Sequence, residues 1–259
     1  MRTGVAFALV LALCGCGSST PQVAPSPKVA NFALNSKLMG RQMYGVLVTP
    51  AGGGKGRPLL VFLHGYGAAP RDMFTGAFAA ALRRLGNRAP VVVLPEGDVG
   101  WWHDRAGEPW GRYVLHEVIP AAVARSGADP KRVAIGGVSM GGFGALDLGR
   151  IAPQRFCAIG AHSPAIFSSD PGFDSFDGPA DFRRNDLLRI ARGHSPYRAP
   201  VWIDIGNRDE LRPGAAALAR ELRADGAHLS FHVWPGEHTI RYWNAHFADY
   251  LRFYADACG

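Results

Sequence analysis

A serine set between two glycines constrains this chain more than any other feature. The motif Gly137-Val138-Ser139-Met140-Gly141 follows the apolar run Arg132–Ile135, which predicts a short buried strand, and precedes residues 145–151, which favour a helix. A serine on a sharp turn between strand and helix projects its hydroxyl clear of a sheet, and small neighbours are needed where strand and helix nearly touch. The motif therefore predicts a nucleophile at Ser139. The alternative interpretation is a glycine-rich turn with an incidental serine.

The rest of the chain alternates predicted strands with predicted helices. Strands are predicted at residues 43–49, 59–63, 91–95, 156–160, 201–205 and 229–233, and helices at 72–85, 113–124, 215–225 and 240–256. Residues Phe167–Tyr197 interrupt this alternation with a stretch rich in Asp, Gly, Pro, Ser and Phe, and predict an insertion that covers the site. A chain of 259 residues with 47% hydrophobic residues is long enough for one α/β domain, with a mostly parallel central sheet and helices on both faces.

A serine nucleophile needs a base and an acid, which on such a sheet follow it in chain order. Asp209 comes just after the predicted strand 201–205, and His238 lies in a loop directly before the final helix. These two residues are the predicted acid and base. Asp204, inside the strand, and Glu210 are the alternatives for the acid. His228, His232 and His246 are predicted to be packing or surface residues, and chain order disfavours His162 as the base because it precedes Asp209.

Backbone amides are predicted to stabilise the oxyanion. Met140 follows the nucleophile and supplies one amide, and Tyr66, in the glycine-rich stretch after strand 59–63, supplies the other. In the same stretch His64 is predicted to hold the loop in shape by hydrogen bonding. Candidate substrate contacts are His64, Gly65, Trp101 and Trp102, and further candidates for the pocket are Asp98, Phe167 and Phe176. The alternative for the two tryptophans is aromatic packing beneath the loop. Cysteine and histidine show no zinc-type spacing, and the chemistry requires neither metal nor cofactor.

The N-terminal residues predict export. Residues 5–13 form an apolar run too short to span a bilayer, as in a signal peptide. The following Leu13-Cys14-Gly15-Cys16 resembles the lipobox of bacterial lipoproteins, with Cys16 as the lipidated residue. The predicted organisation is a signal peptide over residues 1–16, a flexible tether over 17–36 and a catalytic domain over 37–259. An ordinary cleaved signal peptide and a secreted protein are the alternative.

Two further cysteines, Cys157 and Cys258, are predicted at the edge of the sheet opposite the active site. Because an exported protein can form disulfides, a bridge between them is one hypothesis, and two free thiols are the other.

The net charge of +7 comes from scattered arginines rather than a Lys/Arg run. This pattern favours a solvated basic surface over a nucleic-acid partner, with weak affinity for an anionic membrane or wall surface as an alternative.

The chain resembles α/β-hydrolases of the serine esterase group that includes esterase D, feruloyl and acetylxylan esterases and the antigen 85 mycolyltransferases. The resemblance covers residues 43–254. It rests on these motifs: His64-Gly65-Tyr66-Gly67, residues 110–113 leading to 117–120, residues 137–146, Gly206-Asn207-Arg208-Asp209, and Gly236-Glu237-His238 with Trp243 beyond. It implies an α/β-hydrolase fold whose insertion follows the sixth strand, and acyl-group chemistry on a small-molecule or glycan-linked carboxylic ester. Thr239 departs from the family pattern, whereas Gly141-Gly142 favours hydrolysis over acyl transfer. An acyltransferase and a non-catalytic surface-binding lipoprotein remain the competing functions.

Overall fold

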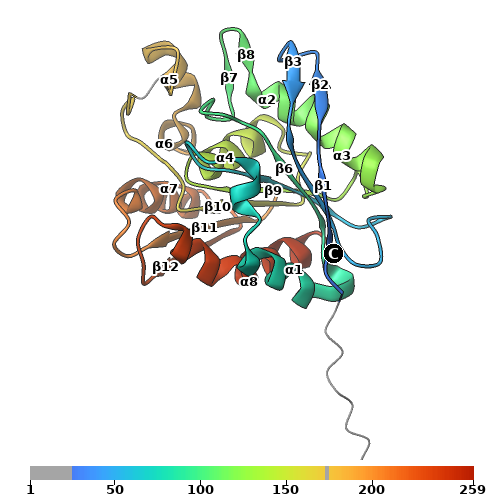
Figure 1. Ribbon diagram of the computed structural model, residues 1–259. Coiled ribbons are helices and arrows are strands. Elements are labelled where there is room, and N and C mark those ends of the chain that lie inside the picture. Colours follow the sequence, from blue (N-terminus) through green and yellow to red (C-terminus); the bar gives the residue numbers. More distant parts are fainter. Residues whose placement is uncertain (1–24, 173–174) are drawn as a thin grey trace, which may run out of the picture.

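An eight-stranded sheet organises the protein, as the computed structural model of residues 25–172 and 175–259 shows (Figure 1). Across the sheet the strands are β1 (Lys28–Asn31), β4 (Gly45–Thr49), β6 (Val91–Pro95), β5 (Leu59–Leu63), β9 (Val133–Val138), β10 (Ala158–His162), β11 (Val201–Gly206) and β12 (Leu229–Trp234). Strand β4 runs antiparallel to β1 and β6, and all pairs from β6 to β12 are parallel. The predicted α/β fold with a mostly parallel sheet is confirmed.

Helices cover both faces of the sheet. One face carries α1 (Gly76–Leu85) and α8 (Ile240–Ala257), which lie side by side in Figure 1; the other carries α3 (Ile119–Ser126), α4 (Met140–Ile151) and α7 (Arg212–Ala224). Successive side chains of a strand point to opposite faces. In β5, Leu59, Val61 and Leu63 therefore join one apolar cluster, while Leu60 and Phe62 join the other. Burial on both faces explains the uninterrupted apolar runs of the central strands.

The parallel strands begin at one edge of the sheet and end at the opposite edge. We call the edge where these strands end, at Leu63, Pro95, Val138, His162, Gly206 and Trp234, the carboxyl edge. We call the edge where they begin, at Leu59, Val91, Val133, Ala158, Val201 and Leu229, the amino edge. The loops that lead into the helices all leave from the carboxyl edge, and ligands of parallel sheets bind there.

The N-terminal boundary of the domain lies earlier than the sequence predicts. Residues 28–36 fall within the predicted tether, yet residues 28–31 form β1, and β2 (Leu34–Ser36) pairs with β3 (Arg41–Met43). Phe32, between them, is 1% exposed and lies under the guanidinium of Arg125, 4.6 Å away. Composition could not reveal this, because the strand is held by a partner distant in the sequence. The predicted signal peptide, Cys16 and most of the tether lie outside the described residues.

The helix predicted at residues 113–124 is longer and irregular. It consists of α2 (Trp110–Tyr113), the π turn η3 (Val114–Val118) and α3. Pro120 lacks the N–H that an α-helix needs at that position, so the extra turn precedes it. The remaining short elements are η1 (Pro70–Met73), η2 (Gly86–Arg88), β7 (Asp104–Arg105), β8 (Glu108–Pro109), α5 (Pro179–Asn185) and α6 (Leu187–Ile190). Helices α5 and α6 belong to the predicted insertion, which follows β10.

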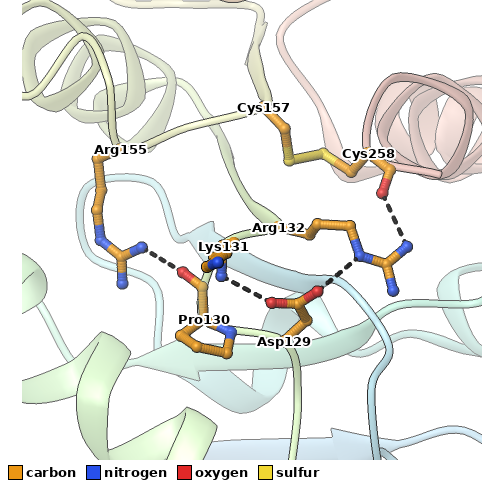
Figure 2. Close-up of a disulfide and its surroundings, with 7 residues drawn as sticks. All are labelled: Asp129, Pro130, Lys131, Arg132, Arg155, Cys157 and Cys258. Atoms are coloured by element: carbon orange, nitrogen blue, oxygen red, sulfur yellow. Dashed lines mark hydrogen bonds and ion pairs between the residues drawn. A yellow bond between two sulfur atoms is a disulfide. The ribbon is translucent and has the colours of Figure 1, made fainter.

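A disulfide joins Cys157, just before β10, to Cys258, just after α8 (Figure 2). Their Cα atoms are 5.3 Å apart across a sequence separation of 101 residues. The bridge lies at the amino edge and ties the last helix to the centre of the sheet. Over residues 25–172 and 175–259, no helix has the length and apolarity needed to cross a membrane.

Candidate active site

Ser139 lies at the tip of the turn from β9 into α4. Its backbone φ of 55° and ψ of −118° fall in a region that residues other than glycine rarely adopt. The neighbouring glycines have no room for a side chain: a Cβ on Gly137 would lie 2.5 Å from the carbonyl carbon of Gly141, and one on Gly141 would lie 2.2 Å from the carbonyl oxygen of Leu63. The spacing of glycine around serine is therefore a steric requirement of this turn.

Strained backbone is concentrated near Ser139. Within the described part of the chain, the non-glycine residues with positive φ are Asp98, Trp101, Trp102, Ser139 and Ser163. All follow β6, β9 or β10 at the carboxyl edge. Such conformations cost on the order of 1–3 kcal/mol each and persist where the surrounding structure enforces them, which is common at functional sites.

The side chains of Ser139, His238 and Asp209 form a continuous hydrogen-bonded chain. His238 Nε2 lies 2.9 Å from Ser139 Oγ, and His238 Nδ1 lies 2.9 Å from Asp209 Oδ2. Since a carboxylate can only accept, Nδ1 carries the proton and Nε2 accepts from the serine hydroxyl. The structure thus brings together, from three separate loops, the three residues that the sequence singles out.

Asp209 is held as an anion. The residue is 4% exposed, and burial by itself opposes ionisation. Hydrogen bonds from His238 and from the Leu211 amide, 2.9 Å from Oδ1, outweigh that effect and hold the pKa of Asp209 below its ordinary value. A charged carboxylate in this position orients the imidazole of His238 and stabilises its protonated form.

The loop after β5 closes on Ser139 from the side. A Cβ on Gly65 would lie 3.3 Å from the Cβ of Ser139, so the backbone of this loop touches the serine. His64 holds the loop: its Nε2 accepts from the Gly97 amide at 3.0 Å, and its Nδ1 lies 2.8 Å from the Gly65 carbonyl oxygen. Burial lowers the pKa of His64, which is consistent with a neutral ring that donates from Nδ1.

The predicted oxyanion amides flank Ser139 from two elements. Met140 is the first residue of α4, so its N–H belongs to the helix turn in which amides have no acceptor within the helix. Tyr66 directly follows Gly65 in the loop that contacts the serine, and its ring is 50% exposed. Met140 thus follows Ser139 in the chain, and Tyr66 follows the glycine that contacts it.

Three of the predicted substrate contacts are buried packing residues. His64 is 1% exposed, Trp101 4% and Trp102 0%. The Trp102 indole donates to the His64 carbonyl at 3.1 Å, and the Trp101 ring packs edge-on against Phe143. Burial of Trp101 and Trp102 favours the alternative, aromatic packing in the loop after β6, and His64 holds the loop after β5 by hydrogen bonds, as predicted. The sequence places them correctly at the carboxyl edge but cannot show which way they point.

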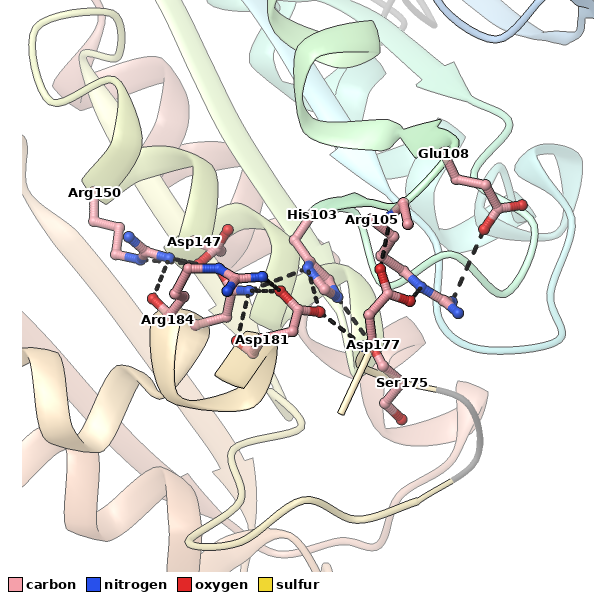
Figure 3. A network of polar contacts seen from close by, with 11 residues as sticks. His103, Arg105, Glu108, Asp147, Arg150, Ser175, Asp177, Asp181 and Arg184 are labelled. Atoms are coloured by element: carbon pink, nitrogen blue, oxygen red, sulfur yellow. Dashed lines mark hydrogen bonds and ion pairs between the residues drawn. The ribbon is translucent and has the colours of Figure 1, made fainter. Parts of the chain in front are cut away.

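The insertion is fastened to the core by a polar network (Figure 3). Asp181 in α5, 1% exposed, accepts from Asn185 at 3.0 Å, from Arg184 at 3.0 Å and from the Asp177 amide at 2.9 Å. Arg150 of α4 bridges Asp147 and the Asn185 side-chain oxygen. The helix that begins at the nucleophile is thereby joined to the insertion, and the insertion holds Phe176 against the Trp101 ring.

A buried polar cluster behind the site has no counterpart among the sequence predictions. Asp204 of β11 accepts four hydrogen bonds: from His162 at 2.6 Å, from the Trp202 indole at 2.9 Å, and from the Tyr242 and Tyr250 hydroxyls at 2.9 and 2.6 Å. The two tyrosines lie on α8, which begins two residues after His238. The cluster thus fixes α8, and with it the histidine loop, to the sheet. The tyrosine spacing marks one face of the helix, but the carboxylate it meets could not be identified from spacing.

Metal-binding side chains do not converge in this structure. Among the residues it describes, no group of three or more His, Cys, Asp or Glu side chains could hold a metal ion. The arrangement that is present, a hydroxyl, an imidazole and a carboxylate in series beside two backbone amides, can activate the hydroxyl as a nucleophile and stabilise an oxyanion.

Known proteins resemble this chain in sequence. A family model described as "Putative esterase" matches residues 36–254. An S-formylglutathione hydrolase of Paracoccus denitrificans is 30% identical over 179 residues, which cover 62% of this chain and 63% of that protein. An esterase of Mycobacterium tuberculosis is 25% identical over 229 residues, which cover 73% of this chain and 50% of that protein. The chain spans less than two thirds of the length of these curated relatives.

Solved structures share the fold. A ferulic acid esterase superposes with a TM-score of 0.78 at 22% identity, covering 90% of this chain and 98% of that one. An S-formylglutathione hydrolase from Agrobacterium tumefaciens superposes with a TM-score of 0.77 at 22% identity, covering 90% of this chain and 96% of that one. The architecture around Ser139 is therefore that of α/β-hydrolases.

Proposed function

Because the chain belongs to the esterase family whose model spans residues 36–254, we propose that it is a serine hydrolase of carboxylic esters that works through an acyl-enzyme on Ser139. The observation that carries this proposal is the unbroken chain of hydrogen bonds from Ser139 Oγ through His238 to the ionised Asp209. Residues that only support a fold have no need for such a series at a strained turn.

The geometry gives each residue a role. His238 Nε2 takes the proton of Ser139 as Oγ attacks the ester carbonyl carbon, and Asp209 stabilises the imidazolium that forms. His238 then gives the proton to the leaving alcohol, which departs as the acyl–serine bond is made. A water molecule then loses a proton to His238 and attacks the acyl carbon; the bond from that carbon to Ser139 Oγ breaks, His238 returns the proton to Oγ, and the acid leaves.

We assign the oxyanion hole to the amides of Tyr66 and Met140. Each would donate to the carbonyl oxygen as it becomes negatively charged, and one such donor typically contributes about 3 kcal/mol to transition-state stabilisation. Both donors are backbone groups on fixed elements, so substituting their side chains leaves them in place. Tyr66→Ala is expected to change kcat far less than any substitution of Ser139.

Hydrolysis of p-nitrophenyl acetate by wild type and Ser139→Ala tests the proposal. Ser230→Ala is the matched control, because this serine is exposed on β12, remote from the carboxyl edge. We expect Ser139→Ala to abolish turnover and Ser230→Ala to retain it. Mass spectrometry after treatment with an organophosphonate should find the adduct on Ser139 of wild type. Equal turnover by wild type and Ser139→Ala would refute the proposal.

Activity against a panel of different esters would define the substrate. Relatives of this chain are named for S-formylglutathione and ferulic acid, so the panel should include both of those acyl groups. p-Nitrophenyl esters from acetate to palmitate would report the acyl length. Adding alcohol or sugar acceptors separates hydrolysis from acyl transfer, and exclusive transfer to an acceptor would overturn the hydrolase assignment.

We further propose that the protein is exported and anchored to a bilayer through lipid on Cys16. Support comes from the short apolar run before Cys16 and from the disulfide between Cys157 and Cys258, which is typical of proteins outside the reducing cytosol. Growth with a labelled fatty acid should label the wild-type protein and leave Cys16→Ala unlabelled. Equal labelling of both would exclude Cys16 as the attachment site.

A further inference from the structure

We propose that the amino edge of the domain is a docking surface for an anionic lipid bilayer, which leaves Ser139 on the side that faces away from the lipid. The orientation of the domain, with its amino edge toward the lipid, rests on the proposed lipid anchor at Cys16. Three features of the described residues carry the proposal: the sign of the charge on each edge, the basic side chains there that bond to neutral acceptors, and the place where the chain enters the domain.

Basic side chains gather at the amino edge. By their positions at strand starts, helix ends and connecting loops, these are Lys28, Lys55, Arg57, Arg83, Arg84, Arg88, Arg125, Lys131, Arg132, Arg155, Arg198, Arg220, Arg223 and Arg252. The acidic residues of the same edge are Asp129, Glu221, Asp225, Asp249 and Asp256. Loops of the carboxyl edge, by contrast, carry acidic and basic residues in similar numbers. The protein is therefore electrically polarised along its strands.

Four of these basic residues form ion pairs within the edge, and others donate to neutral acceptors; the pairs are Arg88–Asp256, Arg132–Asp129, Arg220–Glu221 and Arg252–Asp249. Arg57 donates to the backbone carbonyls of Ala51, Gly86 and Ala89, and Arg155 donates to the carbonyl of Pro130 at 2.6 Å. Backbone oxygens satisfy hydrogen bonds but do not cancel charge.

Figure 2 shows Arg155, Lys131 and Arg132 around the disulfide, with Asp129 as the acidic residue among them. Arginines in the last turns of helices complement the helix dipole, which accounts for Arg83 and Arg84. It does not account for Lys131 or Arg155, which lie in loops.

The chain enters the domain at this same edge. Strand β1 begins at Lys28, which pairs with Thr49 where β4 ends, and Pro25 and Pro27 line a surface cavity with Arg83. The nine residues from Gly17 to Pro25 can span at most about 30 Å. A lipid on Cys16 would therefore hold the amino edge close to the headgroups.

The attraction between basic residues and an anionic bilayer is large enough to hold this edge at the membrane. A basic residue near an anionic membrane contributes about 1 kcal/mol of attraction, roughly a fivefold gain in partitioning, within a Debye length of about 8 Å. A tether that keeps the edge near the surface raises its effective concentration there. The consequence for function is that the ester reaches Ser139 from the aqueous side, as a soluble or wall-borne molecule.

Cosedimentation with vesicles tests this surface. The full chain carrying Cys16→Ala would be mixed with phosphatidylcholine vesicles and with vesicles in which a third of the lipid is phosphatidylglycerol. Binding through the apolar N-terminal run is common to both, so the ratio of partition coefficients isolates charge. The test variant adds Lys55→Gln, Arg84→Gln and Lys131→Gln. The matched control instead adds three substitutions of exposed residues in loops or helix starts at the carboxyl edge: Arg71→Gln, Arg212→Gln and Arg241→Gln.

We expect an anionic preference of at least about tenfold for the parent, largely lost in the amino-edge variant and lowered by less than about twofold in the control. Equal losses in both variants, no preference in the parent, or a preference that survives 0.5 M salt would overturn the proposal. Tighter binding to duplex DNA than to anionic vesicles would overturn the choice of partner. Fatty-acid labelling reports on the anchor separately, so a failed anchor and a failed surface give different results.

Discussion

Removing one oxygen from Tyr250 tests whether the buried cluster around Asp204 holds the last helix in place. Tyr250 is fully buried, and its hydroxyl donates to Asp204 Oδ2 at 2.6 Å. Burial raises the pKa of this hydroxyl well above its ordinary value, so it remains a donor at neutral pH. Tyr250→Phe keeps the ring and its packing on His162, and removes only the hydrogen bond.

The magnitude follows from the kind of bond that is lost. A hydrogen bond to a charged group contributes about 1.5–3 kcal/mol, and Asp204 keeps three other donors, so no acceptor is left empty. We expect Tyr250→Phe to lower the free energy of unfolding by about 2 kcal/mol, roughly 30-fold in the unfolding equilibrium. With a urea m-value of about 2–3 kcal/mol/M, the midpoint should fall by about 0.7–1 M.

The matched control is Tyr44→Phe, which removes the same atom from a tyrosine that is 54% exposed and bonded to Gln42. Its effect should stay within about 0.5 kcal/mol. Because α8 begins just after His238, Tyr250→Phe should also lower kcat more than it raises KM. Urea unfolding that finds equal losses in the two variants would refute the reasoning about the cluster.

Three further outcomes are expected. Replacing both Cys157 and Cys258 by serine, or reducing the wild type, should lower the unfolding free energy by about 4–5 kcal/mol, since the bridge closes a separation of 101 residues; an unchanged thermal midpoint would contradict this. Gly141→Ala places a Cβ 2.2 Å from a backbone oxygen and should reduce kcat/KM by at least about 100-fold, whereas Gly76→Ala, which meets no atom within 4 Å, should leave it unchanged. Because the folded pKa of Asp209 is lowered, its stabilising effect is complete above its unfolded pKa of about 4 and is lost as the pH falls through the folded value. Urea unfolding of Asp209→Asn should therefore show a smaller loss of stability than wild type between pH 5 and pH 3, and parallel losses would argue against an ionised Asp209.

Local sequence determined the buried strands and the tight turn that carries Ser139. The apolar run of β5 and the β-branched run of β9 predict buried strands, because a strand covered on both faces has no polar side. Glycines at 137 and 141 predict the tight turn, since no other residue fits against the carbonyl of Leu63. Chain order then selects Asp209 and His238 in loops after strands, where parallel topology places side chains on one edge.

The features that the sequence did not reveal depend on the direction of a side chain or on contacts between segments far apart in the chain. Trp101 and Trp102 occupy the predicted edge, yet their backbone turns them into the core, and no local pattern encodes that inversion. Strand β1 was hidden in a proline-rich stretch, because its stability comes from pairing with β4. Helix α3 is preceded by a π turn for which Pro120 is the local cause, but its exact course depends on packing.

The sequence by itself determined which residue types this protein could use for chemistry and in what order they follow one another. Only the tertiary structure decided that Ser139 Oγ and His238 Nε2 lie 2.9 Å apart, that Asp204 is buried among tyrosines of α8, and that positive charge gathers at the amino edge. The physical reason is the range of the forces involved. Backbone preferences and glycine sterics act over a few residues, whereas hydrogen bonds and surface charge depend on distances in space between segments far apart in the chain.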